Sequence, residues 1–286
     1  MRVLVTGANG QLGRAMMGQT RSGTELIGTA RQDCEISRGG IFGLDITNHD
    51  EVISSISKFS PDVVVNAAAL TGVDLCERNP ALAENVNSKG AASIALACSL
   101  IGCKMVQVST DYVFDGERGG YSEEDSVNPI QEYGRTKLMG EQLANEILGE
   151  DLTIVRTSVV FDGMSNNFVT WVLNSLRCES EIKLVEDQWV SPTSSNFLAL
   201  SILSVIKTGF SGIINIASSK GVSRVEMGRI IAERFSLDDG KITNSSMDEL
   251  DWEASRPRNS TLNCSKFGNI GDLMGFKEML EIEFSN

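Results

Sequence analysis

The apolar positions of the first 158 residues alternate between short β-rich runs and longer segments with helical spacing. Continuous apolar runs are typical of strands that a parallel sheet buries on both faces, whereas repeats at three and four residues indicate amphipathic helices. Strands are predicted at residues 2–6, 25–29, 62–66, 104–108 and 152–156, with helices at 12–17, 52–59, 81–101 and 133–147. This order predicts an α/β fold with a doubly wound parallel sheet of the Rossmann type.

The pattern loosens after Ser158, where residues 167–176, 196–206 and 225–235 have helical spacing and residues 212–217 form one more apolar run. We expect a dinucleotide-binding domain at residues 1–158, with 193–218 returning to it. Residues 159–192 and 219–286 are then expected to form a smaller C-terminal substrate-binding lobe.

The composition is that of a globular protein, with 41% hydrophobic and 22% charged residues in 286. A net charge of −13 argues against a nucleic-acid partner, since such binding needs a basic surface. We expect a cytoplasmic protein without a membrane partner, because no run approaches the roughly 18 apolar residues of a membrane span and no export signal is visible.

Metal and nucleophilic chemistry have little support in the sequence. The six cysteines form no CxxC pair, so we expect reduced thiols and no metal site, although scattered carboxylates leave a bound magnesium ion open. The single histidine, His49, lies in what looks like a helix start, which does not favour a serine or cysteine nucleophile paired with it.

A glycine-rich turn follows the first predicted strand and opens the first helix. Gly7, Gly10, Gln11, Leu12 and Gly13 belong to this turn. Glycines at this spacing allow a tight reversal and let backbone amides at the helix N-terminus approach a pyrophosphate. The position of the motif between strand and helix predicts binding of a dinucleotide.

The end of the second strand carries Arg31 where NAD-binding sheets commonly have an acid. An arginine there can pair with a 2′-phosphate, so we expect NADPH, with NADH left open. Asp45 and Ile46 follow a short predicted strand and are expected at the adenine end of the cofactor.

Small residues follow the buried strand at 62–66. Ala67, Ala68 and Ala69 let a flat ligand lie against the backbone at the carboxyl edge of the sheet. Packing against a helix is the alternative for these alanines. Thr71 stands in the loop beyond them.

Proton-transfer chemistry is predicted at two neighbouring segments. Tyr133 and Lys137 are four residues apart and therefore share a helix face, where an ammonium can lower the pKa of a phenol. Thr110, Asp111 and Tyr112 close the preceding strand at the carboxyl edge, where a hydroxyl can hydrogen-bond a substrate carbonyl. A turn or helix cap is the plainer interpretation of that cluster.

Taken together, these motifs resemble the extended short-chain dehydrogenase/reductases, and within them the dTDP-4-dehydrorhamnose reductases. The resemblance is carried by the glycine turn and by the following segments: 44–47, 65–69, 71–74, 86–87, 109–116, 133–137, 156–158, 187–188, 191–193, 256–257 and 259–260.

The resemblance implies reduction of the C4 keto group of a dTDP-hexose. Tyr133 would protonate the oxygen, Lys137 would hold the nicotinamide ribose, and Thr110 would hydrogen-bond the carbonyl. The substrate would be bound by Thr71, Asp111, Tyr112, Asn167 and Arg256. Arg256 and Arg258 would neutralise the diphosphate, although a structural salt bridge is an equal alternative for both. The protein is also expected to form a homodimer.

One position departs from the family pattern. After Arg156-Thr157-Ser158 we expect a tryptophan against the sugar, but this chain has Val159, which removes a flat stacking surface. Two other functions remain open at this point. One is a non-catalytic NADP-binding subunit resembling the β subunit of methionine adenosyltransferase, and the other is a nucleotide-sugar epimerase or dehydratase.

Overall fold

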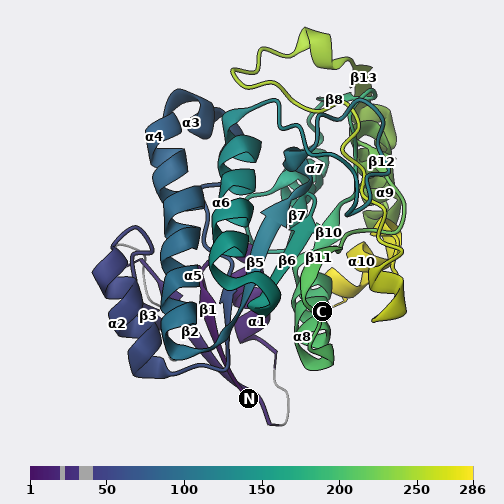
Figure 1. The fold of residues 1–286 in the computed structure, drawn as a ribbon. Coiled ribbons are helices and arrows are strands. Elements are labelled where there is room, and N and C mark those ends of the chain that lie inside the picture. The colour runs from purple at the N-terminus through teal and green to yellow at the C-terminus, as the bar shows by residue number, and fades with distance from the viewer. Residues whose placement is uncertain (20–22, 32–40, 286) are drawn as a thin grey trace.

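The computed structural model describes residues 1–19, 23–31 and 41–285. A seven-stranded sheet forms its centre, in the order β11-β6-β5-β4-β1-β2-β3, with every neighbouring pair parallel (Figure 1). The strands are β1 Arg2–Thr6, β2 Glu25–Ala30, β3 Ile41–Gly43, β4 Val63–Asn66, β5 Lys104–Thr110, β6 Leu152–Thr157 and β11 Gly212–Asn215. The predicted doubly wound Rossmann sheet is confirmed.

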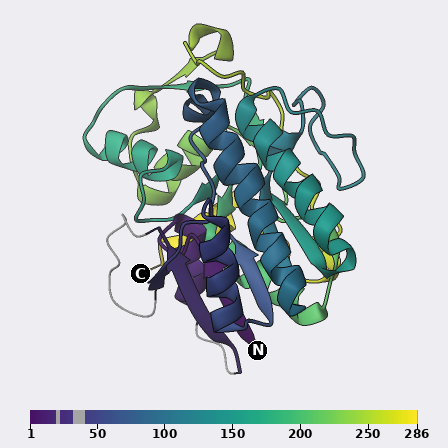
Figure 2. The ribbon, with the colours of Figure 1, turned by 60° about the vertical axis from the view of Figure 1, so that its left-hand side comes forward.

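The strand order reverses between β1 and β4, which places a crevice at their carboxyl ends. Helices cover both faces of the sheet (Figures 1 and 2). They are α1 Gln11–Met17, α2 His49–Phe59, α3 Val73–Arg78, α4 Pro80–Ala83, α5 Gly90–Ile101, α6 Glu132–Leu148 and α8 Ser195–Thr208. Ligands of open α/β sheets bind at this edge, outside the carboxyl ends of the strands.

The segment predicted as one helix over 81–101 has a different local structure. A π-helical turn, η1 (Glu84–Lys89), separates α4 from α5. π-helical turns occur frequently at functional sites. Inside this one, Asn87 accepts a hydrogen bond from Leu70 N (2.8 Å) and donates to Leu70 O (3.1 Å) and Thr136 Oγ1 (3.2 Å). The turn therefore ties the loop after β4 to α6.

The later part of the chain adds a second group of elements beside the carboxyl edge of the sheet (Figure 1). It consists of β7 Val160–Phe161, α7 Phe168–Arg177, β8 Ile182–Val185, β9 Trp189–Val190, β10 Thr193–Ser194, β12 Val222–Ser223, α9 Arg224–Phe235, β13 Ile242–Ser245 and α10 Phe276–Glu283. Short 3₁₀ turns, η2 Asp111–Val113, η3 Gly149–Asp151, η4 Asp239–Lys241, η5 Met247–Glu249 and η6 Phe267–Asn269, join these parts. The domain boundaries at 158, 192 and 218 remain our proposal.

Two apolar clusters hold the sheet, one on each face. One includes Val3, Val65 and Val106, and the other includes Leu4, Val64 and Met105. Neighbouring residues of a strand point to opposite faces, so a continuous run of apolar residues serves both clusters. This explains why the central strands contain runs of valine.

Five cysteines in the described ranges, Cys76, Cys98, Cys103, Cys178 and Cys264, are free thiols. Cys34 lies outside those ranges. His49 is the first residue of α2, which Asn48 caps by accepting a hydrogen bond from Glu51 N at 3.3 Å. None of the helices in the part of the chain that the structure describes is both long enough and apolar enough to cross a membrane.

Candidate active site

A cavity of about 460 Å³ opens at the carboxyl edge of the sheet, beside the switch between β1 and β4. Its size is in the range of small-molecule sites. The predicted cofactor residues Gly7, Gly10, Arg31, Asp45, Ile46, Ala67, Ala68 and Ala69 all line it. The structure therefore brings together, in one cavity, residues as far apart in the sequence as Gly7 and Ala69.

The glycine turn has the shape that a pyrophosphate cradle needs. Gly7 has φ of +67°, which favours glycine, and Gly10 N donates to Gly7 O at 2.9 Å to close the turn. A Cβ on Gly13 would lie 2.2 Å from Gly7 O and 2.6 Å from Ala8 Cα, so the helix packs on the turn without space for a side chain. Gln11, Leu12 and Gly13 form the start of α1 behind this turn and do not line the cavity.

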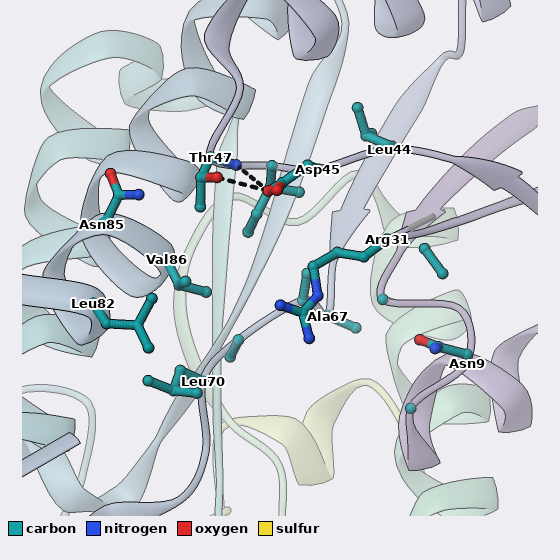
Figure 3. Close-up of a pocket in the computed structure, with 16 residues that line it drawn as sticks. Asn9, Arg31, Leu44, Asp45, Thr47, Ala67, Leu70, Leu82, Asn85 and Val86 are labelled. Atoms are coloured by element: carbon teal, nitrogen blue, oxygen red, sulfur yellow. Dashed lines mark hydrogen bonds between the residues drawn. The ribbon is translucent and has the colours of Figure 1, made fainter. Parts of the chain in front are cut away.

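Figure 3 shows Arg31 extending into the cavity from the end of β2, and Asp45 follows the end of the neighbouring parallel strand β3. The Asp45 carboxylate is oriented by Thr47, whose backbone N and Oγ1 donate to Asp45 Oδ1 at 2.9 and 2.7 Å. A guanidinium and a fixed carboxylate thus face the same space. Such a pair fits the adenosine end of a dinucleotide, where a guanidinium can contact a phosphate and a carboxylate can accept from hydroxyl groups.

The three predicted catalytic residues lie on adjacent elements. Thr110 ends β5, and Tyr133 and Lys137 share a face of α6. Lys137 is buried and donates from Nζ to Val108 O at 2.6 Å. The ring of Tyr112 stands edge-on to that of Tyr133, with centroids 6.0 Å apart.

Burial dominates the acid–base properties of this trio. It raises the pKa of Tyr133 above its ordinary value, despite a hydrogen bond with Thr110 that acts in the other direction. It also lowers the pKa of Lys137 to about 8, against the opposing charge of Glu141. Burial therefore outweighs the expected depression of the tyrosine pKa, and Tyr133 is held as a neutral phenol, the form that donates a proton.

A chain of hydrogen bonds crosses the sheet beneath the lysine. Thr6 Oγ1 donates to Asn66 Oδ1 (2.6 Å), and Asn66 Nδ2 donates to Gln107 Oε1 (2.8 Å). Gln107 Nε2 then donates to Val108 O (3.0 Å), which also accepts the bond from Lys137. Buried polar groups in such a network have fixed orientations, so the position of the ammonium is set from three strands.

Tyr112 lines a second cavity, of about 450 Å³. Aromatic and cationic side chains from the later part of the chain form much of its wall. Its lining includes Tyr112, Val159, Phe168, Trp171, Lys183, Gln188, Arg224, Trp252 and Arg256. Flat rings and guanidinium groups together suit an aromatic base carrying phosphates.

Arg256 lines this second cavity and is also ion-paired. Its Nη2 donates to Asp74 Oδ2 at 2.9 Å, and its guanidinium lies 5.3 Å from the ring centroid of Trp252. Arg258 is paired instead with Asp187 and Asp248 and is half exposed. Arg256 is the arginine of the two that faces the cavity, while Arg258 fixes its own loop to the segment after β8.

The other predicted substrate residues lie apart from this cavity. Thr71 is exposed in the loop before α3. Asn167 caps α7 and donates from Nδ2 to Gln11 Oε1 at 3.1 Å, which joins α7 to α1. Asp111 is buried, and three hydroxyl groups surround its carboxylate. None of the three lines the cavity.

Val159 lies in the cavity wall with a positive φ of 40°. A β-branched residue in this region is strained, and such outliers concentrate at functional sites. Phe168 and Trp171 line the same cavity, so aromatic surface is available there from α7. The cavity thus lacks the tryptophan expected at position 159 but keeps other flat aromatic surfaces.

Sequence reasoning did not find several residues of the two cavities. Leu82, Asn85 and Val86 reach the first cavity from α4 and the π-helical turn, whose geometry no pattern predicts. The second cavity gathers Phe168, Trp171, Lys183, Arg224 and Trp252 from four separate segments. All three tryptophans of the chain lie after residue 160, which was the one available signal.

The chain was compared with protein families and with known proteins. Residues 1–281 match the family described as RmlD substrate binding domain. A probable low-salt glycan biosynthesis reductase from Haloferax volcanii is 34% identical over 279 residues, 95% of this chain and 93% of the relative. A dTDP-4-dehydrorhamnose reductase from Sinorhizobium fredii is 33% identical over 277 residues, 93% of this chain and 90% of the relative.

Solved structures give the same result. A dTDP-4-dehydrorhamnose reductase from Clostridium acetobutylicum superposes with a TM-score of 0.91 at 35% identity, over 100% of this chain and 99% of the other. A dTDP-4-dehydrorhamnose reductase from Bacillus anthracis, solved in complex with NADP, has a TM-score of 0.90 at 31% identity, with 99% and 98% covered.

Proposed function

Since this chain belongs to the RmlD substrate-binding-domain family, we propose that it is an NADPH-dependent nucleotide-sugar oxidoreductase that reduces dTDP-4-dehydro-L-rhamnose to dTDP-L-rhamnose. The observation that carries the proposal is the hydrogen-bonded link from Lys137, through Val108 O and Gln107, to Asn66. Asn66 directly precedes the alanines that line the cavity containing Arg31, and Thr110 and Tyr133 lie on the same two elements as Val108 and Lys137. The relative solved with NADP supports the cofactor, and relatives named as dTDP-4-dehydrorhamnose reductases support the reaction.

The first cavity fits a dinucleotide in three respects. The glycine turn leaves no Cβ between the backbone and the expected pyrophosphate, Arg31 supplies a cation for a 2′-phosphate, and the alanines after β4 leave a flat wall. NADPH bound there supplies a hydride to the C4 carbon of the sugar. We assign the nicotinamide ribose to Lys137, whose position the network through Asn66 and Gln107 fixes.

The protein supplies one proton and the orientation of the carbonyl. Tyr133 donates its phenolic proton to the C4 oxygen as the carbon accepts the hydride, so the ketone becomes a secondary alcohol and the phenol is restored from water. Thr110 donates a hydrogen bond to the same oxygen. The second cavity then takes the nucleotide, with Arg256 and Arg224 near the phosphates and the aromatic side chains near the base.

The test is a spectrophotometric assay of NADPH oxidation with a panel of nucleotide 4-keto-sugars. We expect turnover with dTDP-4-dehydro-L-rhamnose and a loss of at least about 100-fold in kcat for Tyr133→Phe, the effect expected when a general acid is removed. Tyr121→Phe is the matched control, because it also removes a tyrosine hydroxyl. The ring of Tyr121 stacks on Phe114 and lines neither cavity. NADPH binding without turnover on any of these sugars would contradict the proposal.

A further inference from the structure

The carboxylate of Asp111 is buried directly behind the reacting groups. Only 2% of the residue is exposed, and no salt bridge to it is found within residues 1–19, 23–31 and 41–285. Its partners are three hydroxyl groups. Ser158 and Ser260 donate to Oδ2 at 2.7 and 2.5 Å, and Thr110 Oγ1 lies 3.1 Å from Oδ1. A buried carboxyl with neutral partners and no obvious structural ion pair needs an explanation.

The three hydroxyl groups come from distant parts of the chain. Ser158 follows β6, whereas Ser260 lies 149 residues from Asp111 in the C-terminal segment. That segment is held in place because Ser260 N donates to Trp189 O (3.1 Å) and Trp189 N donates to Arg258 O (2.7 Å). It also carries Arg256 in the wall of the second cavity. Asp111 therefore joins the wall of the substrate cavity to the hydroxyl at the reacting carbonyl.

The number of available protons decides how Thr110 can act. A carbonyl oxygen only accepts, so Thr110 must donate its single proton to the substrate. It cannot donate that proton to Asp111 at the same time. If Asp111 carries a proton on Oδ1, the carboxyl donates to Thr110 Oγ1 while Oδ2 still accepts from both serines. Burial raises the pKa of Asp111, which favours this neutral form, although the serines, Thr110 and nearby Arg224 act against it.

We propose that Asp111 is a positioning residue for the reduction. It donates from Oδ1 to Thr110 and so directs the threonine proton to the substrate. Ser260 in turn fixes Asp111 from the wall of the substrate cavity. The inference rests on the proposed function, because it concerns the orientation of Thr110 during that reaction. It also gives a role to the Arg256-Pro257 and Asn259-Ser260 signatures, since the segment that contacts substrate also holds the carboxyl behind the threonine.

Asp111→Asn and Asp111→Ala separate this role from that of a charged group. The amide of asparagine donates from Nδ2 and accepts at Oδ1, so it reproduces the neutral carboxyl. We expect Asp111→Asn to retain kcat within about tenfold and Asp111→Ala to lose about 100-fold, the cost of a misplaced reacting group. Equal losses in the two variants would overturn the proposal, because they would show that an ionised carboxylate is required.

Ser260→Ala and Ser260→Thr provide a second test that leaves Asp111 intact. We expect kcat of Ser260→Ala to fall about tenfold with KM and the NADPH dissociation constant within about twofold, and Ser260→Thr to restore most of it. An unchanged kcat in Ser260→Ala with a lower melting temperature would mean a structural role alone and would overturn the inference. Wild-type protein that reduces no nucleotide keto-sugar would instead overturn the proposed function, and this inference with it.

Discussion

The glycine turn offers a sharp test of the cofactor cavity, because two of its glycines are needed for different reasons. A Cβ on Gly13 would meet two backbone atoms, Gly7 O at 2.2 Å and Ala8 Cα at 2.6 Å, which cannot rotate away. A Cβ on Gly10 would meet only Gly7 O at 3.3 Å, and the φ of −77° at Gly10 is open to alanine. Gly13→Ala and Gly10→Ala are therefore a matched pair.

The expected magnitudes differ in kind. In Gly13→Ala, overpacking against fixed backbone atoms costs about 3 kcal/mol, the upper end of the usual range, and the gain in helix propensity returns about 1 kcal/mol. The net loss is therefore about 2 kcal/mol. In Gly10→Ala, the free energy of unfolding changes by less than about 0.5 kcal/mol. Its added methyl group lies at the backbone that approaches the pyrophosphate, so NADPH affinity falls by about tenfold, or 1.4 kcal/mol.

Denaturant unfolding without cofactor and fluorescence titration with NADPH measure the two quantities separately. Gly13→Ala should lose both stability and NADPH affinity, and Gly10→Ala should lose affinity alone. If Gly10→Ala binds NADPH as tightly as the wild type, the pyrophosphate does not lie on this turn. If Gly13→Ala is as stable as the wild type, the close contact between α1 and the turn does not constrain the fold.

Substitutions at three further positions test the energetics of the site. Lys137→Met should stabilise the cofactor-free protein at pH 7 by about 2 kcal/mol, since the lowered pKa costs about 3 kcal/mol and the lost hydrogen bond to Val108 about 1. This gain in stability should shrink as pH rises from about 8 to 10.5, because in that range the unfolded wild-type protein binds more protons than the folded one. A difference in thermal stability between Lys137→Met and the wild type that does not change with pH would refute this. Glu141→Gln should lower the free energy of unfolding, measured in urea, by about 3 kcal/mol. The reason is that Arg156, whose side chain is 3% exposed, loses the carboxylate that lies 2.7 Å away. A loss below about 1 kcal/mol would argue against the pairing. In the same measurement, Val159→Gly should be about 1 kcal/mol more stable than Val159→Ala, because only glycine adopts the positive φ without strain. Equal stabilities of the two variants would contradict that strain.

Local patterns were sufficient to predict the sheet, and they singled out residues that the fold gathers around one cavity. Strand β1 matched its predicted range, and β4 and β5 differed from theirs only at the ends, because strands buried on both faces are continuous apolar runs. The glycine turn was identified because its chemistry depends on consecutive residues. The relatives also bear out the predicted NADPH-dependent reductase over a non-catalytic subunit.

Long-range contacts could not be predicted in this way. The hydrogen bond from Ser260 to Asp111 joins residues 149 apart, and its existence depends on how the C-terminal segment returns to β5. The sequence pairing of Tyr133 with Lys137 suggested a lowered tyrosine pKa, but burial has the larger effect in the ligand-free protein and raises it. Burial is a property of the assembled fold, so the spacing of two residues on a helix cannot supply it.

The transfer of deuterium from NADPH to the sugar tests the central claim most directly. The protein is incubated with dTDP-4-dehydro-L-rhamnose and NADPH deuterated at the transferable C4 position of the nicotinamide, and the product is analysed by NMR and mass spectrometry. We expect one deuterium at C4 of a dTDP-L-rhamnose product, at a rate that falls at least about 100-fold in Tyr133→Phe and is unchanged in Tyr121→Phe. A product without deuterium at C4, or equal rates in wild type and Tyr133→Phe, would contradict it.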